Sequence, residues 1–258
     1  MKVYNSPVKD TSYFLYRLIS PVFDPIHFIQ GVTGYVWFIR DLISYKLKDP
    51  KAKLLTRNLF PILDEKVSFT PFDAQYYHQQ LWVFEHVFKK KPKLHVDIAS
   101  TYELSGYLSK IVKTKFIDYR PIKANLKNLI IERGDILNLD IPENSIESLS
   151  CLHTAEHIGL GRYGDPLDPQ GTEKACKSLS RILAKNGRLY FSLPIGKERI
   201  CFNAHRVHSP LTILKYFNKL TLVSFSVVDD EGVFKENVNP RDYTTGNYSC
   251  GMFLFTKK

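Results

Sequence analysis

The sequence predicts an α/β fold: a mostly parallel sheet of seven strands with an antiparallel hairpin at one edge, preceded by a helical N-terminal extension. From residue 93 onward, short apolar runs of strand length alternate with helical segments, as right-handed crossovers between parallel strands require. The last two strand-like runs are joined without a full helix, which indicates an antiparallel pair. We therefore divide the chain into an extension, residues 1–90, and an α/β domain, residues 91–258.

The extension is rich in aromatic residues, and its helical patterns are broken by proline and glycine. Because proline removes a backbone donor and glycine lowers helix propensity, we expect several short helices there. A better helix is predicted over Asp73–Phe88, where apolar residues recur at helical spacing. The interrupting residues upstream are Pro21, Pro25, Gly31 and Gly34.

Each element of the α/β domain is predicted from a local pattern. Strands are apolar runs that close at an acidic or turn-forming residue, and helices carry apolar residues three and four apart. Ser209 and Pro210 suit the N-cap and first position of the last helix. The predicted strands are 94–99, 115–119, 129–133, 146–152, 187–193, 222–228 and 248–256. The predicted helices are 102–112, 171–183 and 211–220.

Composition narrows the class of protein. Apolar residues make up 44% of the 258 residues, enough for a sizeable core. The formal net charge is +10, and the first 60 residues carry nine basic and four acidic side chains. None of the four cysteines forms a CxxC pair, and Cys151, Cys176 and Cys250 lie in apolar segments, which favours a reducing, cytoplasmic location and core positions for these three. No secretory leader pattern opens the chain.

Acidic residues follow the first three strands of the predicted sheet. An open α/β sheet binds ligands beyond the carboxyl ends of its strands. Asp97 closes the first strand, and Asp118 lies 21 residues later, at the end of the second. A carboxylate there can accept hydrogen bonds from ribose hydroxyls, although acidic residues also end strands at solvent. Asp135 follows the third strand, where it can meet an adenine amino group.

A second group of candidate residues follows the fourth strand. His153, Glu156 and His157 lie in the run HTAEH, which matches the H-x-x-E-H pattern of inverted zinc peptidases. That chemistry needs the motif on a helix, whereas here it follows a strand and leads into glycines. We expect these residues to serve as catalytic acid–base groups, with no metal assigned. The alternative is that Glu156 and His157 only hold a glycine-rich loop in place.

Two loops supply candidate contacts to an acceptor. The loop Gly159–Gly171 is punctuated by glycine and proline, so it is shaped rather than floppy. It forms either an acceptor-binding lid or a rigid connection to the next helix. The run Asn203–Arg206 follows the fifth strand at the same edge. We expect His205 to be catalytic and the following residues to bind substrate: Arg162, Tyr163, Asp165, Asn203 and Arg206.

Residues 93–256 resemble the class I S-adenosylmethionine-dependent methyltransferases through the motifs HVDIAS, FIDYR, GDI and LAKNGRLYFSLP. The run from Ser148 to Gly171 and the hexapeptide CFNAHR more closely resemble an uncharacterised methyltransferase-like family found in nematodes and in bacterial surface-polysaccharide gene clusters. The resemblance implies a Rossmann-like fold and S-adenosyl-L-methionine as cofactor. It places the cofactor against Asp97, Ala99, Ser100, Asp118, Tyr119, Asp135 and Ile136.

One departure from the methyltransferase pattern concerns the turn after the first strand. Glycine there usually lets the backbone approach the cofactor. In this chain Ala99, Ser100 and Thr101 occupy the turn, and side chains at these positions are expected to narrow the pocket.

We expect a methyltransferase acting on a hydroxyl, such as that of a surface-polysaccharide sugar. His157 or His153 would serve as the base, oriented by Glu156. The alternative is a non-catalytic or repurposed Rossmann module that binds a sugar nucleotide or a partner glycosyltransferase. A nicotinamide-dependent reductase is disfavoured because no G-x-G-x-x-G motif follows a strand.

The partners expected are a small-molecule or glycan acceptor and no nucleic acid, because the basic residues are scattered. The run Pro25–Ile39 is uncharged but only 15 residues long, whereas a membrane span needs about 20. Residues 1–60 are therefore expected either to touch a membrane surface peripherally or to cover the cofactor site.

Overall fold

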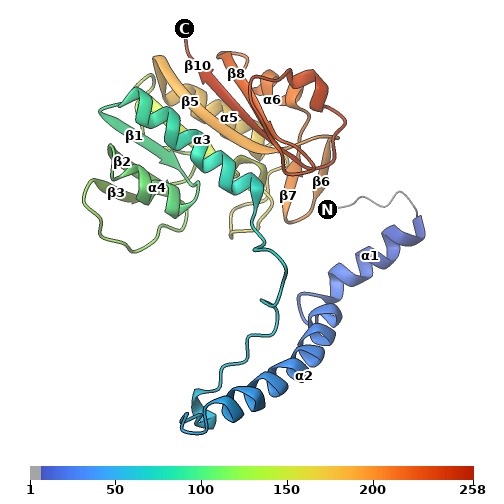
Figure 1. Ribbon diagram of the computed structural model, residues 1–258. Coiled ribbons are helices and arrows are strands. Elements are labelled where there is room, and N and C mark those ends of the chain that lie inside the picture. The colour runs from blue at the N-terminus through green and yellow to red at the C-terminus, as the bar shows by residue number, and fades with distance from the viewer. Residues whose placement is uncertain (1–6) are drawn as a thin grey trace. The chain divides into compact units, whose positions relative to one another are not determined.

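Residues 7–258 are described by the computed structural model, and they form two units (Figure 1). The first unit ends at Pro71, and the second comprises Phe72–Lys258. The boundary predicted near residue 90 lies too far along the chain. The helix that was assigned to the extension instead packs its buried Trp82, Val83 and Val87 in a core of the second unit.

The first unit consists of α1 (Pro7–Ile19), α2 (Pro25–Lys48) and a short 3-10 turn at Thr56–Asn58. Asp24 caps α2 by accepting the backbone N–H groups of Ile26 and His27. The prediction of several short helices is wrong, because α2 continues through both glycines. A helical glycine costs about 1 kcal/mol but loses no hydrogen bond, whereas the prolines lie at the break and at the first position of α2, where they are tolerated.

Gly34 has a packing role in this unit. A Cβ atom there would lie 2.8 Å from the Cβ of Leu63. The glycine therefore lets the segment after α2 pack against one side of the helix. Lys66 reinforces this contact, because its ammonium lies 4.6 Å from the Trp37 ring centroid and 2.8 Å from an Asp41 carboxylate oxygen.

The second unit is built on an eight-stranded sheet with the order β3-β2-β1-β4-β5-β10-β8-β9. The first five strands are parallel, and β10 runs antiparallel to both β5 and β8. This confirms the predicted mostly parallel, Rossmann-like sheet with antiparallel strands at one edge. The two-residue β9 adds an eighth strand. The strands are β1 (Leu94–Ile98), β2 (Lys113–Asp118), β3 (Leu129–Arg133), β4 (Ile146–Leu152), β5 (Leu183–Ile195), β8 (Thr221–Val228), β9 (Phe234–Lys235) and β10 (Ser249–Thr256).

Helices cover both faces of this sheet (Figure 1). On one face, α3 (Ala74–Lys90) and α4 (Tyr102–Leu108) pack on Tyr190, Met252 and Leu254. On the other, α5 (Gly171–Ile182) and α6 (Pro210–Tyr216) bury Leu179 and Ile213 against a larger core. Cys151, Cys176 and Cys250 are free and buried, as predicted.

Two helices end earlier than predicted because their last turns tighten. Beyond Leu108 and Tyr216, the N–H groups of Ile111 and Leu220 bond to carbonyls three residues back, a 3-10 pattern that does not continue the α-helix. The start of α6 agrees with prediction, since Ser209 caps it and Pro210 follows.

A small hairpin after β5 was not predicted. It consists of β6 (Arg199–Cys201) and β7 (His205–Val207), which pair antiparallel. Short 3-10 turns also occur at Ala155–His157 and Pro240–Tyr243. The strand order reverses between β1 and β4, and in open α/β sheets a ligand crevice forms at such a point.

Candidate functional site

The turn after β1 reaches the glycine-type conformation without glycine. Ala99 has a φ of +53°, in the left-handed region that alanine adopts at a cost. Two bonds hold the turn against the end of β4: the Ser100 hydroxyl accepts the Leu152 N–H at 3.0 Å, and the Thr154 hydroxyl donates to the Ala99 carbonyl at 2.7 Å. Thr101 caps α4. The side chains expected to narrow the pocket are thus partly used to fix the turn.

Asp97 lies beneath this turn and is fully buried. One of its oxygens accepts the Ser100 N–H at 3.0 Å, and the other accepts the hydroxyl of Ser150. Burial raises the pKa of Asp97 to about 6, although the serine bonds oppose that shift. Both oxygens are occupied by the protein, so the predicted cofactor contact of Asp97 has no support from its surroundings.

A buried histidine extends this hydrogen-bonded chain. The His95 nitrogens lie 2.8 Å from the Ser148 hydroxyl and 2.9 Å from the Ser150 hydroxyl. Since Ser150 donates to Asp97, it accepts from His95, which fixes the Nε2–H tautomer. Desolvation lowers the pKa of His95 to about 3, so this side chain is neutral over the physiological range.

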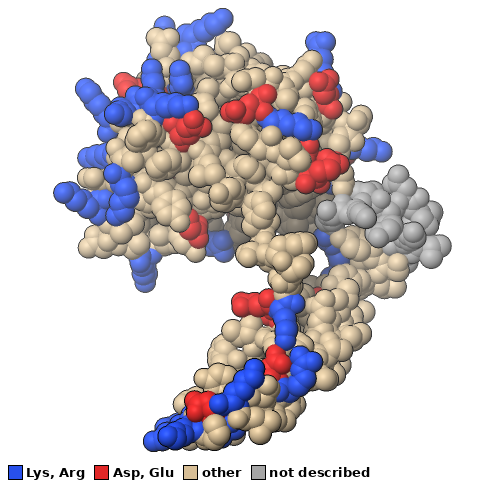
Figure 2. All heavy atoms as spheres, viewed as in Figure 1, with Lys and Arg blue, Asp and Glu red and all other residues tan. Residues whose placement is uncertain are grey.

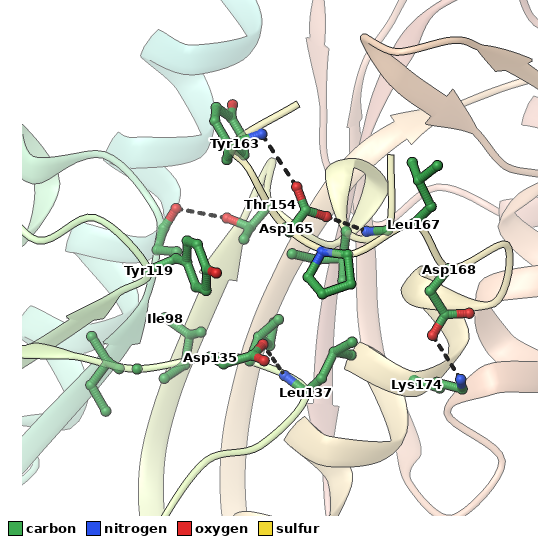
Figure 3. Close-up of a pocket in the computed structure, with 17 residues that line it drawn as sticks. Ile98, Tyr119, Asp135, Leu137, Thr154, Tyr163, Asp165, Leu167, Asp168 and Lys174 are labelled. Carbon is green, nitrogen blue, oxygen red and sulfur yellow. Dashed lines mark hydrogen bonds and ion pairs between the residues drawn. The ribbon is translucent and has the colours of Figure 1, made fainter. Parts of the chain in front are cut away.

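The carboxyl ends of β1, β2 and β3 line a cavity of about 380 Å³. Its walls include Ile98 and Ile117, and Tyr119 and Asp135 project from the sheet side toward the loop that carries Tyr163 (Figure 3). Asp135 accepts the Leu137 N–H with one carboxylate oxygen. The volume lies within the range of roughly 300–1,000 Å³ typical of small-molecule sites.

A second cavity of about 220 Å³ adjoins the first, because the two share Ala99, Tyr119, Thr154, Ile158 and Tyr163. It is lined by Asp118, His153 and His157. One oxygen of Asp118 accepts the Arg120 N–H at 2.6 Å; among the described residues, no donor reaches its other oxygen. We refer to the two cavities together as the crevice.

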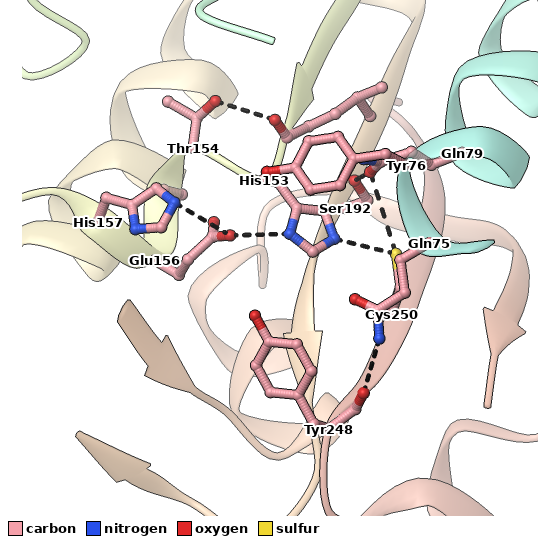
Figure 4. Close-up of polar contacts among 12 residues, drawn as sticks. Gln75, Tyr76, Gln79, His153, Thr154, Glu156, His157, Ser192, Tyr248 and Cys250 are labelled. Atoms are coloured by element: carbon pink, nitrogen blue, oxygen red, sulfur yellow. Dashed lines mark hydrogen bonds and ion pairs between the residues drawn. The ribbon is translucent and has the colours of Figure 1, made fainter. Parts of the chain in front are cut away.

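Glu156 lies fully buried between the two histidines of the HTAEH run (Figure 4). Its Oε1 atom is 3.2 Å from His153 Nδ1 and 3.7 Å from His157 Nε2. Neither carboxylate oxygen receives a well-formed hydrogen bond from the described residues. Burial opposes its charge, but the histidines, His153 first, lower the pKa of Glu156. The residue is therefore a buried carboxylate balanced mainly by ion pairing.

His153 serves as the main counter-charge. Its Nε2 atom lies 3.3 Å from Cys250 Sγ, and its ring packs on Tyr76 with centroids 5.0 Å apart. Burial opposes protonation, but the contacts with Cys250 and Glu156 raise the pKa of His153 to about 10. Its φ of +47° is strained for a non-glycine residue. His153 is thus held as an imidazolium at the crevice wall.

His157 has the opposite character. Its Nδ1 lies 2.6 Å from the carbonyl oxygen of Ala204 and 3.2 Å from a guanidinium nitrogen of Arg162. Because the carbonyl contact is the shorter and a carbonyl only accepts, we assign the proton to Nδ1 and the lone pair to Nε2. Burial lowers the pKa of His157, while Glu156 opposes this shift. A neutral histidine with a free Nε2 lone pair, close to a carboxylate, has the properties of a general base.

The loop Gly159–Gly171 covers one side of the crevice and is anchored by Arg206. The buried guanidinium donates to the Ile158 carbonyl at 2.6 Å and to the Asp168 carbonyl at 3.0 Å. Asp165 accepts the Gly159 N–H at 2.7 Å. A Cβ atom on Gly159 would lie 2.1 Å from the Asp168 carbonyl oxygen. The loop is therefore rigidly shaped, and Arg206 acts as a positioning residue.

Arginine and tyrosine side chains gather at the rim of the crevice. The guanidinium carbon of Arg120 lies 4.3 Å from the Tyr163 ring centroid, and that of Arg162 lies 5.1 Å from it. Arg162 also donates to the Ala204 carbonyl at 3.0 Å. Asn203 is exposed near the hairpin turn, and His205 packs on Tyr248 with ring centroids 5.0 Å apart. Burial lowers the pKa of His205.

The structure thus brings most predicted site residues together, while their roles stay predictions. Ten of the predicted site residues line the crevice: Ala99, Ser100, Asp118, Tyr119, Asp135, Ile136, His153, His157, Tyr163 and Asp165. Those that lie behind or beside its lining are Asp97, Glu156, Arg162, Asn203, His205 and Arg206. Within residues 7–258, no group of three or more His, Cys, Asp or Glu side chains could hold a metal ion.

Sequence reasoning missed several residues of the crevice. Tyr76 reaches it from α3, and the Thr154 hydroxyl ties the ends of β1 and β4 together. Cys250 contacts His153 from β10, 97 residues away along the chain. Arg120 and Thr154 carried a usable signal, since each lies two residues after the end of a strand, β2 and β4 respectively.

Known proteins give a limited comparison. The model of a family described as "Caenorhabditis protein of unknown function, DUF268" matches residues 129–239. This segment contains the HTAEH run, the glycine-rich loop and the β6–β7 hairpin. No curated protein matches the chain significantly.

Among solved structures, the chain is similar to the YcgJ protein of Bacillus subtilis, at 13% identity and a TM-score of 0.48 over 70% of this chain and 99% of the other. A methyltransferase described as S-adenosylmethionine-dependent, from Clostridium acetobutylicum, matches at 14% identity and a TM-score of 0.48 over 72% and 93% of the two chains. The N-methyltransferase NodS of Bradyrhizobium japonicum, solved with S-adenosyl-L-homocysteine, matches at 13% identity and a TM-score of 0.49 over 72% and 89%. The strand order of the sheet, rather than these likenesses, defines the fold.

Proposed function

We propose that this protein is an S-adenosylmethionine-dependent methyltransferase that acts on a hydroxyl group of a small-molecule or glycan acceptor. The observation that carries the proposal is one crevice, at the reversal of strand order, lined by both Asp118 and the neutral His157. A carboxylate suited to ribose and a base suited to a hydroxyl thus lie in a single site.

The residues present fit the cofactor. Asp118 keeps one carboxylate oxygen available after accepting the Arg120 N–H, so that oxygen can accept from a ribose hydroxyl. Asp135 and Ile136 line the apolar cavity beside β3, where a flat purine ring would fit. The left-handed Ala99 supplies the close turn that glycine commonly gives. When bound, S-adenosylmethionine supplies an electrophilic methyl group on a sulfonium.

Acid–base chemistry divides between the two crevice histidines. His153 is already protonated near neutral pH, because its pKa is about 10, so it cannot take a proton. His157 can accept the hydroxyl proton on Nε2, and the nearby Glu156 carboxylate, 3.7 Å away, then stabilises the imidazolium. The sequence left the catalytic base open between His153 and His157. We therefore assign this role to His157.

Acceptor binding is assigned to the rim of the crevice. Tyr163 presents an aromatic ring flanked by two guanidinium groups, and such a surface suits the apolar face and the hydroxyls of a sugar ring. The protein also aligns the acceptor with the methyl donor. The loop anchored by Arg206 and the wall formed by Tyr76 hold the acceptor in place.

The proposal is tested by following S-adenosylhomocysteine formation with a panel of sugars and sugar nucleotides. We expect turnover that depends on a hydroxylated acceptor. His157→Asn keeps a side-chain N–H for the Ala204 carbonyl but removes the base, and should lower kcat by about 10²–10⁴-fold. His86→Asn is a matched control, since His86 Nδ1 also lies 2.8 Å from a backbone carbonyl, that of Trp82. Equal activity of the two variants would exclude His157 as the base.

A further inference from the structure

The first unit carries an apolar surface that none of its described residues covers. Large apolar side chains are exposed along both α1 and α2, most of them by half or more, with Val36 at 72% and Phe14 at 62%. Soluble monomers seldom expose contiguous apolar surface of this kind without a partner. The exposed members on α2 are Ile26, Phe28, Ile29, Val32, Tyr35, Val36, Ile39, Ile43, Tyr45 and Leu47.

On α2 these residues gather on one face. At 3.6 residues per turn, most of them, from Phe28 to Leu47, fall within an arc of about 120°. A different side of α2 makes the contacts within the first unit. On that side Gly34 faces Leu63, and the Lys66 ammonium lies over the Trp37 ring. The uncovered face is therefore turned away from the contacts that hold the unit together.

Charge distribution around this face is asymmetric. No Lys, Arg, Asp or Glu lies between Pro25 and Ile39, whereas the end of α2 and the segment after it are basic. Figure 2 shows Lys and Arg crowded at this end of the unit. The basic residues are Arg40, Lys46, Lys48, Lys51, Lys53 and Arg57. Two of them also have partners within the unit: Arg40 pairs with Asp41, and Lys46 donates to the Pro50 and Ala52 carbonyls.

We propose that α1 and α2 bind in the plane of a membrane surface that carries anionic lipids. An interfacial helix buries an apolar face among acyl chains and directs basic side chains to the headgroups. Tyr35, at 48% exposure on this face, suits the interfacial layer because its ring is apolar and its hydroxyl polar. The proposal is independent of the methyltransferase assignment.

The dimensions favour lying in the surface over crossing it. The uncharged run from Pro25 to Ile39 has 15 residues, which span about 22 Å as a helix, against a hydrocarbon core of roughly 30 Å. Over the described part of the chain, no helix has the length and hydropathy of a membrane span.

A second copy of the unit fits this face less well. Two of the acidic side chains beside it are engaged: Asp24 with Tyr16 and His27, and Asp41 with Arg40 and Lys66. A second copy would therefore meet the basic cluster without these two carboxylates, whereas phosphate headgroups supply negative charge directly.

Flotation of the full-length protein with vesicles tests the proposal. We expect the protein to float with vesicles containing phosphatidylglycerol, and at least tenfold less with pure phosphatidylcholine or in 0.5 M salt. Ile29→Asp with Val36→Asp should abolish flotation, because both positions are exposed and the substitutions leave the fold intact. Val223→Asp, at 52% exposure on β8, is the control and should float like the wild type.

Three results would overturn the proposal. The first is wild-type protein that stays in the aqueous fraction when anionic vesicles are present. The second is an Ile29→Asp/Val36→Asp variant that floats like the wild type. The third is a wild type that forms concentration-dependent dimers in sedimentation, which the double variant does not form, while neither protein binds vesicles. The last result would assign the face to a second copy. Circular dichroism melting of each variant confirms that it is folded.

Discussion

Arg206→Met removes the side chain that anchors both ends of the loop over the crevice. Its guanidinium is buried and donates to the Ile158 and Asp168 carbonyls, at 2.6 Å and 3.0 Å. A hydrogen bond from a charged group contributes about 1.5–3 kcal/mol. Relief of the buried charge offsets part of the loss, because methionine fills a similar volume without desolvation. We therefore expect a net destabilisation of about 3 kcal/mol.

The assay is urea unfolding together with calorimetric titration of S-adenosylmethionine. A loss of about 3 kcal/mol corresponds to a fall in Tm of roughly 6–12 °C for a domain of this size. Affinity should also fall, because Gly159, Tyr163 and Asp165 of the same loop line the larger cavity.

Lys257→Met is the matched control for this experiment. The Lys257 ammonium donates to the Ser180 carbonyl at 2.6 Å and contacts the Arg181 carbonyl at 3.4 Å, at the amino-terminal edge of the parallel strands. It should lower stability without altering cofactor affinity. The anchoring role would be refuted if Arg206→Met changed the free energy of unfolding by less than about 0.5 kcal/mol. It would also be refuted if both variants lowered the affinity for S-adenosylmethionine equally.

Three further outcomes are expected. The rate of methyl transfer should fall with acid along a limb below pH 6.5, because burial lowers the pKa of His157 and only its neutral form accepts a proton; a limb above pH 7 would contradict this. His95 stays neutral in the fold down to about pH 3, whereas the unfolded chain binds a proton below about pH 6.5. Acid therefore removes stability from the wild type, and His95→Gln should gain about 1.4 kcal/mol relative to it for each pH unit between these values; parallel unfolding curves for the two proteins would disprove it. Gly159→Ala should destabilise more than Gly164→Ala by roughly 1–3 kcal/mol in thermal unfolding, since both have positive φ but only a Cβ at Gly159 meets the Asp168 carbonyl; equal effects would show that the loop yields.

Local patterns were sufficient to predict the sheet. Most parallel strands of the second unit are short runs rich in apolar residues, and β1 and β2 end at or next to an aspartate, Asp97 and Asp118. A local pattern of this kind can be read from the sequence alone. The continuous α2 was not predicted, because its glycines were weighted as breaks although Gly34 serves packing against Leu63. The short β6–β7 hairpin carries too few residues for a period to be recognised.

The candidate site was predictable only where its residues follow strand ends. Asp118 and His157 lie in the crevice for that reason. Asp97 follows the same rule, but its carboxylate accepts a hydrogen bond from Ser150 on β4. This partner cannot be recognised from its position in the sequence. Tyr76 and Cys250 reach His153 from α3 and β10, so their part in the site depends on tertiary packing alone.

Titration of S-adenosylmethionine into the wild type, Asp118→Asn and Asp140→Asn tests the central claim most directly. Asparagine keeps an oxygen for the Arg120 N–H but loses the charged acceptor for ribose, whereas Asp140 is exposed and lines neither cavity in the described structure. We predict measurable binding to the wild type, weakened about 10–100-fold in Asp118→Asn and unchanged in Asp140→Asn. No binding to the wild type at millimolar cofactor, or equal affinity in the wild type and Asp118→Asn, would contradict the assignment of this crevice.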